Sequence, residues 1–299
     1  MTLKKVTCII VTYNAMKWIE KCLRTIKEDD ILLQVVVIDN NSTDDTVNYI
    51  GLHFPNVIIL PQNVNLGFSG ANNVGYEYAK NFGADYIYLL NQDTISYPNS
   101  IASLIKICEK DESIGVASPI HLSRDKSKLD KKFEDYITSG SCPGYISDST
   151  LGQLKEYYPI GFVNAAAWLV KVDAIKSIGG LFSSAFFHYG EDSNFLTRLR
   201  FFNKKCVIVP GIFVHHLRDE REGKMSEAFE KKKLSIKKVE IMTDINSSYK
   251  KSTNTLFRYA GQQLFKGNFS GAFELFFYPL ISMSKIKAIR KSYHSAKII

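Results

Sequence analysis

The sequence predicts an α/β protein built on a mostly parallel sheet with helices on both faces. Strand-like apolar runs alternate with helical patterns through the first half of the chain, and repeated strand–helix units of this kind build parallel sheets. Two of these runs, at 35–38 and 86–90, end in polar segments that carry Asp39 and Asp93. Because ligands of such sheets bind at the carboxyl ends of the strands, these two ends predict an enzyme that handles a nucleotide.

Each predicted element follows from a local pattern. Short apolar runs bounded by polar residues predict strands at 6–12, 35–38, 57–60, 86–90 and 206–209. Helices are expected at 15–27, from about Ser42, at 69–81, 100–109 and 190–202, and within 163–178. The first helix has apolar residues at helical spacing, the second has Ser42 or Thr43 as a cap, and the third follows a glycine-rich turn.

Two segments break this alternation. Residues 121–158 are polar and contain Gly and Pro, which predicts a long loop or a mobile insertion. After Leu217 the sequence becomes a helical pattern rich in Lys and Glu, followed by an apolar stretch. We therefore expect two units, a sheet domain over 1–220 and a basic, mainly helical extension over 221–299.

The composition limits which kinds of protein this chain can be. The 299 residues are 45% hydrophobic and 23% charged, which is ordinary for a globular chain with a sizeable core. The five cysteines are widely scattered, without the spacing of a metal or redox site, and favour a reduced, cytoplasmic setting. A strand pattern begins directly after the first five residues, so no signal peptide is expected.

The net charge of +8 is unevenly distributed. Residues 1–216 carry 21 Lys and Arg against 22 Asp and Glu, whereas residues 217–299 carry 17 against 8. The excess positive charge therefore lies in the extension and favours an anionic partner, either a membrane surface or a nucleic acid. Because the extension has no recognisable nucleic-acid motif, we expect no nucleic acid as a partner.

Asp39 and the glycine-rich turn are candidates for nucleotide contact. The Asp39 carboxylate can accept hydrogen bonds from a base N–H or from ribose hydroxyls, and it lies too far upstream to cap the next helix. The segment 65–75 contains G-x-x-G, whose glycines let the backbone approach a ligand closely. A tight turn with helix–sheet packing explains those glycines equally well.

Asp93 is the leading metal candidate, because a cation that bridges two phosphates needs one or two carboxylates. His215 or His216, at the end of the last strand, can complete the same site, although such a pair is also common as polar structure. Glu191 and Asp192 open a helix, where the helix dipole alone favours acidic residues. In the functional interpretation, Asp192 is a general base within reach of an acceptor hydroxyl.

Together, five segments in order resemble an inverting glycosyltransferase of family 2 with the GT-A fold. The segments are 10–14, 37–44, 65–72, 89–94 and 190–192, within about residues 4–220. The resemblance implies a nucleotide-sugar donor, a divalent metal (Mg²⁺ or Mn²⁺) and a sugar acceptor. It implies that the donor contacts lie at Thr12, Tyr13, Asn14, Asp39, Asn41, Asn65, Gly67, Asn72, Asn91 and Gln92. It also implies a metal at Asp93 and His215, and deprotonation of the acceptor by Asp192 beside Glu191.

Within the family, the chain is most similar to bacterial rhamnosyltransferases that use dTDP-L-rhamnose. The 65–72 segment, the Asn-x-Asp-Thr form of the metal motif and the segment 215–219 carry this similarity. It implies transfer of L-rhamnose to a saccharide or lipid-linked glycan in bacterial surface polysaccharide synthesis, such as that of O-antigen. Asn91 stands where relatives have the first Asp of the metal motif, which leaves Asp93 as its only carboxylate and implies weaker metal binding. Arg218 stands for a Gly, which leaves the choice between His215 and His216 open. Another nucleotide sugar, UDP-hexose or UDP-galactofuranose, is the alternative donor.

Two alternatives concern the whole protein and its extension. A GT-A-like domain without catalysis, serving as a binding subunit, is favoured only by Asn91. The apolar run at 272–283 is too short to span a bilayer, which needs ~20 residues. Flanked by Lys and Arg, it predicts peripheral binding to an anionic membrane on its cytoplasmic face, or else packing on the sheet domain or in a homodimer.

Overall fold

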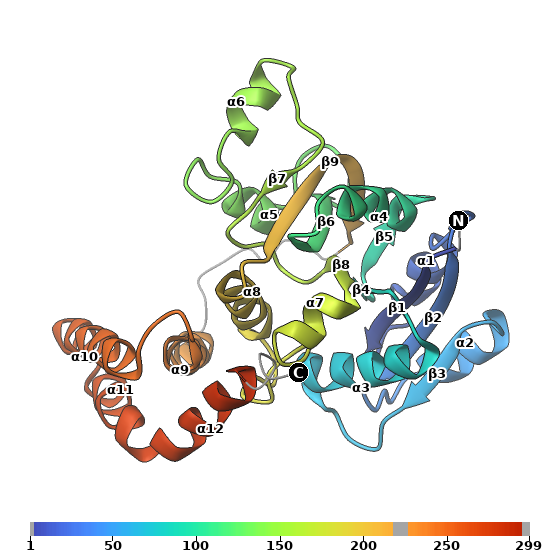
Figure 1. The fold of residues 1–299 in the computed structure, drawn as a ribbon. Helices are drawn as coiled ribbons and strands as arrows, with labels where there is room; N and C mark the ends of the chain where they lie inside the picture. Colours follow the sequence, from blue (N-terminus) through green and yellow to red (C-terminus); the bar gives the residue numbers. More distant parts are fainter. Residues whose placement is uncertain (1–2, 218–226, 295–299) are drawn as a thin grey trace.

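The structure, a computed structural model, describes residues 3–217 and 227–294. One nine-stranded sheet with helices on both faces occupies the first range, and a group of helices follows it (Figure 1). The α/β class and the helical extension are therefore confirmed. The boundary predicted at 220/221 lies outside the described residues.

The strands bring the polar chain segments to one edge of the sheet. They are β1 Lys5–Thr12, β2 Leu32–Asp39, β3 Ile58–Pro61, β4 Tyr86–Asn91, β5 Thr94–Ser96, β6 Ile114–Leu122, β7 Tyr158–Pro159, β8 Ala167–Lys171 and β9 Lys205–His216. β3, β2, β1 and β4 are parallel in that order, with Thr12 opposite Asp39 and Val11 opposite Asn91. β8 is antiparallel to β4 and β6, β9 is parallel to β6, and β5 and β7 are antiparallel to β9.

Helices cover both faces because strand side chains alternate between two buried cores. The helices are α1 Ile19–Arg24, α2 Thr46–His53, α3 Gly67–Phe82, α4 Ser100–Lys110, α5 Lys131–Tyr136, α6 Tyr145–Thr150, α7 Val172–Ser177 and α8 Glu191–Phe201. Ile9 and Leu89 belong to the core under α3, α7 and α8, whereas Ile10 and Leu90 belong to the core under α1, α2 and α4.

Several predicted elements differ from the structure. The first helix, predicted over 15–27, covers only Ile19–Arg24. The second begins at Thr46 and not near Ser42, because Ser42 binds Asp39 instead of capping a helix. The predicted loop at 121–158 contains α5, α6 and β7 and pairs with the sheet through β7. β6 was not predicted, and β9 is longer than expected because it continues through Gly211, which has a φ of +84°.

The last four helices form a lobe with its own buried core. They are α9 Glu227–Thr243, α10 Tyr249–Phe265, α11 Phe269–Ile281 and α12 Met283–His294. The lobe is joined to α8, where the Asn194 amide donates to the Thr243 hydroxyl at 3.2 Å. The buried Arg198 guanidinium donates to four oxygens and lies 4.8 Å from the ring centroid of Tyr293. Across the two described ranges, no helix combines the length and the apolar composition needed to cross a membrane.

Candidate active site

The ends of β1 and β2 form the first part of the site. Asp39 is buried and accepts hydrogen bonds from the Thr12 hydroxyl and from the Ser42 backbone N–H, each at 2.9 Å. The Asn14 side chain accepts a bond from the Thr43 N–H at 2.8 Å. Asn14 and Asn41 have positive φ, which Asn tolerates better than most residues. These bonds hold the predicted donor residues of the two loops against each other.

The end of β4 joins the same cluster. The Gln92 side-chain oxygen accepts a hydrogen bond from the Tyr13 N–H at 2.9 Å. Asn91, the last residue of β4, lies opposite Val11 in β1. Seven of the predicted donor residues, at the ends of three neighbouring strands, are therefore brought together.

Asn40, which was not predicted, connects this cluster to the glycine-rich turn. Its buried side chain donates to the Gly67 carbonyl and accepts from the Leu66 N–H, both at 3.0 Å. Asn65 stabilises the same turn by accepting from the Gly67 N–H at 2.8 Å. The sequence signal for Asn40 is its place directly after a buried strand that ends in Asp39.

Within the glycine-rich segment, two predicted donor residues are enclosed by protein. Gly67 has a φ of +70°, and a Cβ at this position would lie 2.1 Å from the Phe187 carbonyl oxygen. The buried Asn72 side chain donates to the Phe68 carbonyl at 2.9 Å inside α3. This position gives Asn72 a packing role, and its contact with the donor stays a prediction. The glycine is required for the close approach of the loop that contains Phe187.

α3 also fixes the loop that leads to the acidic pair. Asn73 exchanges two hydrogen bonds with the backbone of Phe182, at 2.9 and 3.0 Å. The Ser69 hydroxyl donates to the Ser183 carbonyl at 3.2 Å. The segment that the sequence assigned to the donor therefore also positions the residues before Glu191.

Asp93 lies beside His216, with 3.3 Å between Oδ1 of Asp93 and Nε2 of His216. The His215 ring instead lies 2.5 Å from the Tyr97 hydroxyl through its Nε2. Successive side chains of a strand point to opposite faces, so only one of the two histidines can face Asp93. Of the two histidines, the structure therefore places His216, and not the predicted His215, beside Asp93. Arg218, the predicted departure from the relatives' pattern, lies outside the described residues.

The surroundings of His216 are suited to a divalent cation. Asp93 remains 20% exposed while His216 is 3% exposed, so a cation could reach the carboxylate from solvent. Asp130 lies behind the ring, 3.6 Å from Nδ1, where a carboxylate orients a metal-binding histidine. Among the described residues, no three His, Cys, Asp or Glu side chains form a complete metal site. Two protein ligands fit a cation that takes its remaining ligands from phosphates and water.

α8 begins with the acidic pair. Burial raises the pKa of Glu191, and the neighbouring charge of Asp192 raises it further. Burial also raises the pKa of Asp192, and the charge of Glu240 on α9 adds to this shift. A carboxylate with a raised pKa is a stronger base once it is ionised, which suits the role predicted for Asp192.

A short segment before β8 links the acidic pair to the end of β4. The Ala166 carbonyl accepts a hydrogen bond from the Asn91 N–H at 2.9 Å. Burial raises the pKa of Asp192, and the backbone of the neighbouring Ala165 is close enough to offset part of that rise. Asp192 and the end of β4, two residues before Asp93, therefore lie beside the same short segment.

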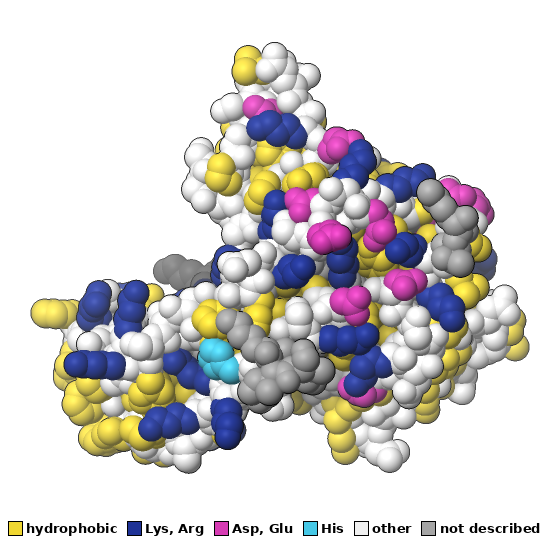
Figure 2. Space-filling view, viewed as in Figure 1, with side chains coloured by type: hydrophobic (Ala, Val, Ile, Leu, Met, Phe, Trp, Pro, Cys, Tyr) yellow, Lys and Arg dark blue, Asp and Glu magenta, His cyan; other side chains and the backbone are white. Residues whose placement is uncertain are grey.

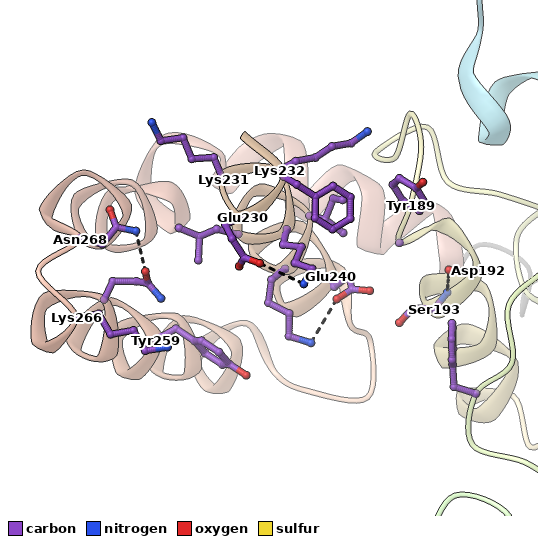
Figure 3. A pocket seen from close by; sticks show the side chains of 18 of the residues that line it. Tyr189, Asp192, Ser193, Glu230, Lys231, Lys232, Glu240, Tyr259, Lys266 and Asn268 are labelled. Carbon is purple, nitrogen blue, oxygen red and sulfur yellow. Dashed lines mark hydrogen bonds and ion pairs between the residues drawn. The ribbon is translucent and has the colours of Figure 1, made fainter. Parts of the chain in front are cut away.

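A cavity of about 940 Å³ opens in front of Asp192 (Figure 3). Its opposite wall comes from α9 and from the turn after α10, including Phe229, Lys232 and Lys266. Lys232 also lies 5.0 Å from the ring centroid of Tyr189, at the cavity edge. Of the described residues that line the cavity, none is a predicted donor contact, and Asp192 is the member of the acidic pair that lines it.

The wall from α9 and α10 was not found by sequence reasoning. No motif marks Phe229, Lys232 or Lys266, and the only signal was the lysine-rich composition after Leu217. That signal was interpreted as a charged outer surface, whereas the structure places part of it opposite Asp192.

Comparisons with known proteins agree with this arrangement. Residues 7–179 match the family model described as Glycosyl transferase family 2. The SPbeta prophage-derived glycosyltransferase SunS of Bacillus subtilis (strain 168) is 35% identical over 102 residues, which cover 34% of this chain and 23% of SunS. N-acetylglucosaminyl-diphospho-decaprenol L-rhamnosyltransferase of Mycobacterium tuberculosis (strain ATCC 25618 / H37Rv) is 25% identical over 245 residues, covering 72% of this chain and 77% of that protein.

A third relative is matched over a shorter part. The dTDP-rhamnosyl transferase RfbG of Shigella flexneri is 29% identical over 165 residues, covering 50% of this chain and 57% of RfbG. The chain therefore spans less than two thirds of SunS and of RfbG.

Solved structures match the fold. The mannosyltransferase PcManGT from Pyrobaculum calidifontis, solved with GDP-Man and Mn²⁺, has a TM-score of 0.57 and 15% identity, covering 100% of this chain and 87% of that one. GalNAc-T7, solved with UDP, GalNAc and Mn²⁺, has a TM-score of 0.58 and 15% identity, covering 83% and 52%. Both are GT-A glycosyltransferases, so the predicted GT-A fold is confirmed.

Proposed function

The chain belongs to glycosyl transferase family 2, and from this premise we propose that it moves one sugar from a nucleotide-sugar donor to an acceptor hydroxyl with inversion at the anomeric carbon. The observation that carries the proposal is that one short segment, Ala165 and Ala166, lies beside both Asp192 and the end of β4 that leads to Asp93. This neighbourhood supports a cation-binding role for Asp93 and a basic role for Asp192, the two roles that a displacement between donor and acceptor requires.

In the proposed reaction, Asp192 takes the proton from the acceptor hydroxyl as the hydroxyl oxygen bonds to the anomeric carbon. The bond from that carbon to the diphosphate oxygen breaks, and the nucleoside diphosphate leaves with the electron pair. Asp192 ends protonated and then returns its proton to water. A single displacement of this kind inverts the anomeric configuration.

On the donor side, we assign the nucleoside to the cluster around Asp39 and Gln92, and the diphosphate to Asp93 and His216. A divalent cation held by these two residues, Mg²⁺ or Mn²⁺, would neutralise charge on the diphosphate. Asp130 lies 3.6 Å from Nδ1 of His216, and Leu217 donates its N–H to the Asp93 carbonyl at 2.7 Å, so both side chains are backed by the protein.

We favour dTDP-L-rhamnose as the donor. Two of the relatives carry rhamnosyl transfer in their names, and RfbG carries dTDP-rhamnosyl transfer. Other nucleotide sugars, such as UDP-hexose or UDP-galactofuranose, are the alternative, because structures with the same fold were solved with UDP or with GDP-Man.

We assign the acceptor to the cavity in front of Asp192. Its aromatic side chains suit the apolar faces of a sugar ring, and its lysines suit an anionic group on the acceptor. We propose a saccharide or lipid-linked glycan of bacterial surface polysaccharide synthesis, acted on at the cytoplasmic face of the membrane. All five cysteines are buried and unpaired, which supports a reducing compartment.

A donor screen tests the proposal. Purified protein with Mn²⁺ is incubated with dTDP-, UDP- and GDP-sugars, with and without a saccharide acceptor, and release of nucleoside diphosphate is measured. We expect release from one nucleotide sugar, strongest from dTDP-L-rhamnose, and its loss in Asp192→Asn. If no donor is turned over although nucleotide binds, the alternative of a non-catalytic GT-A-like subunit is correct.

A further inference from the structure

The lobe carries a row of exposed large apolar side chains on α11 and beside it. This apolar stripe consists of Phe265, Phe269, Phe273, Phe276, Leu280 and Ile281. Phe265 is 96% exposed and Ile281 is 81% exposed. From Phe269 to Leu280 the spacing is three or four residues, so these side chains share one face of the helix. A contiguous exposed apolar surface of this kind marks an interaction site.

The stripe is not needed for the lobe's own core. The opposite face of α11 buries Gly271, Ala272, Leu275 and Pro279. Leu275 belongs to the buried core of the lobe together with Leu256 of α10. α11 is therefore already packed on one side, and the stripe is a second apolar face.

The charge around the stripe identifies the partner. Residues 244–294 carry eight Lys and Arg against two Asp and Glu. Figure 2 shows Lys and Arg beside hydrophobic side chains over the lobe at the lower left, while Asp and Glu gather over the sheet domain. A second copy of the chain would bring like charges together. An anionic lipid bilayer offers both an apolar interior and a negative surface.

The turn between α10 and α11 joins the stripe to the cavity. Lys266, Gly267 and Asn268 line the cavity that contains Asp192. Phe265 and Phe269, on either side of these three residues, are exposed. Part of the cavity wall and the start of the stripe therefore belong to the same turn.

We propose that the apolar stripe docks on an anionic lipid bilayer and that the turn from Phe265 to Phe269 sets the Asp192 cavity at the level of the lipid headgroups. The docking itself is independent of catalysis. Its consequence, that an acceptor reaches Asp192 from the bilayer, rests on the proposed function.

Vesicle sedimentation with the full chain tests the docking. Vesicles of phosphatidylcholine with phosphatidylglycerol are compared with phosphatidylcholine alone, at low and high salt. The test variant is Phe265→Ser/Phe269→Ser/Phe273→Ser. The control variant is Leu52→Ser/Val64→Ser/Leu151→Ser, which removes three exposed apolar side chains from the sheet domain.

We expect the unaltered protein and the control to sediment with anionic vesicles at low salt. The stripe variant should partition at least about tenfold more weakly, because three phenyl groups leave the interface. Binding should weaken as salt rises. The two variants should have equal circular dichroism spectra. They should also release nucleoside diphosphate at equal rates when a water-soluble acceptor is supplied.

Three results would overturn the proposal: no sedimentation of the unaltered protein, equal sedimentation of the stripe variant, or a dimer that the stripe variant converts to a monomer with vesicle binding unchanged. The last would make the stripe a subunit interface. Sedimentation without any donor turnover would sustain the docking and reject the proposed function. Turnover without sedimentation would reject the docking and sustain the proposed function.

Discussion

The donor side and the Asp192 side of the site are built in different ways. The donor side gathers side chains at three strand ends, held by short bonds such as Thr12 to Asp39 and Tyr13 to Gln92. The Asp192 side faces α9 and α10, which come from the last quarter of the chain. Under the proposed function, this difference would assign binding of the nucleotide to the sheet and control over what reaches Asp192 to the extension.

The largest effect is expected from Asp192→Asn. Loss of a general base lowers turnover by ~10²–10⁴-fold, while binding of the donor should change little because Asp192 lies outside the donor side. Turnover at saturating acceptor and binding of the nucleoside diphosphate should be measured on the same preparation. An unchanged kcat would reject Asp192 as the base.

Next in size are the two histidine variants. His216→Ala should weaken metal-dependent binding of the donor diphosphate by at least about tenfold, the scale seen when the surroundings of a metal site are altered. His215→Ala serves as the matched control, since His215 binds Tyr97 on the other face of β9. Calorimetry with Mn²⁺ compares them, and a stronger effect of His215→Ala would restore the prediction made from sequence.

Gly67→Ala tests the connection between the two sides. Gly67 and Gly83 both have positive φ, and an added Cβ at either should cost about 1–2 kcal/mol of stability. Only at Gly67 would that Cβ also meet the Phe187 carbonyl, since at Gly83 nothing lies within 4 Å. Thermal unfolding should therefore show a lower Tm for Gly67→Ala than for Gly83→Ala, together with lost turnover. Equal Tm values would show that the loop at Phe187 moves away freely.

The smallest effect is expected from Glu240→Gln. The Glu240 charge raises the pKa of Asp192, so removing it lowers that pKa and leaves Asp192 ionised at lower pH. The acid limb of kcat/KM should move to lower pH. Glu230→Gln is the matched control, because Glu230 lines the same cavity and pairs with Lys233 at 3.4 Å. If the acid limb moved by the same amount in both variants, the overall charge of the cavity, and not Glu240 in particular, would set the pKa of Asp192.

The sequence predicted the donor side better than the Asp192 side for a physical reason. β1, β2 and β4 contain apolar runs, at 8–11, 35–38 and 86–90, whose polar ends follow directly, so local pattern is enough to place Asp39 and Asp93. Asn40 and Asn73 were missed because their hydrogen bonds join residues far apart in the chain. Such partners leave no periodicity in the sequence.

The sequence did not show which histidine lies beside Asp93, for a related reason. His215 and His216 are adjacent, and alternation alone says only that they face opposite sides of β9. The face of each depends on register, and β9 carries an irregularity in its pairing with β6 at Pro119 and Ile120. The wall of the cavity could not be predicted either, because it depends on how the lobe packs on α8.

Calorimetric titration of the donor nucleoside diphosphate with Mn²⁺ into Asp93→Ala and Asp192→Asn tests the central claim most directly, that the two carboxylates serve separate sides of one site. Asp192→Asn should bind nearly as the unaltered protein does and depend on metal in the same way. Asp93→Ala should lose the metal-dependent part of binding. Equal losses in the two variants, or metal-dependent binding that survives in Asp93→Ala, would contradict the division.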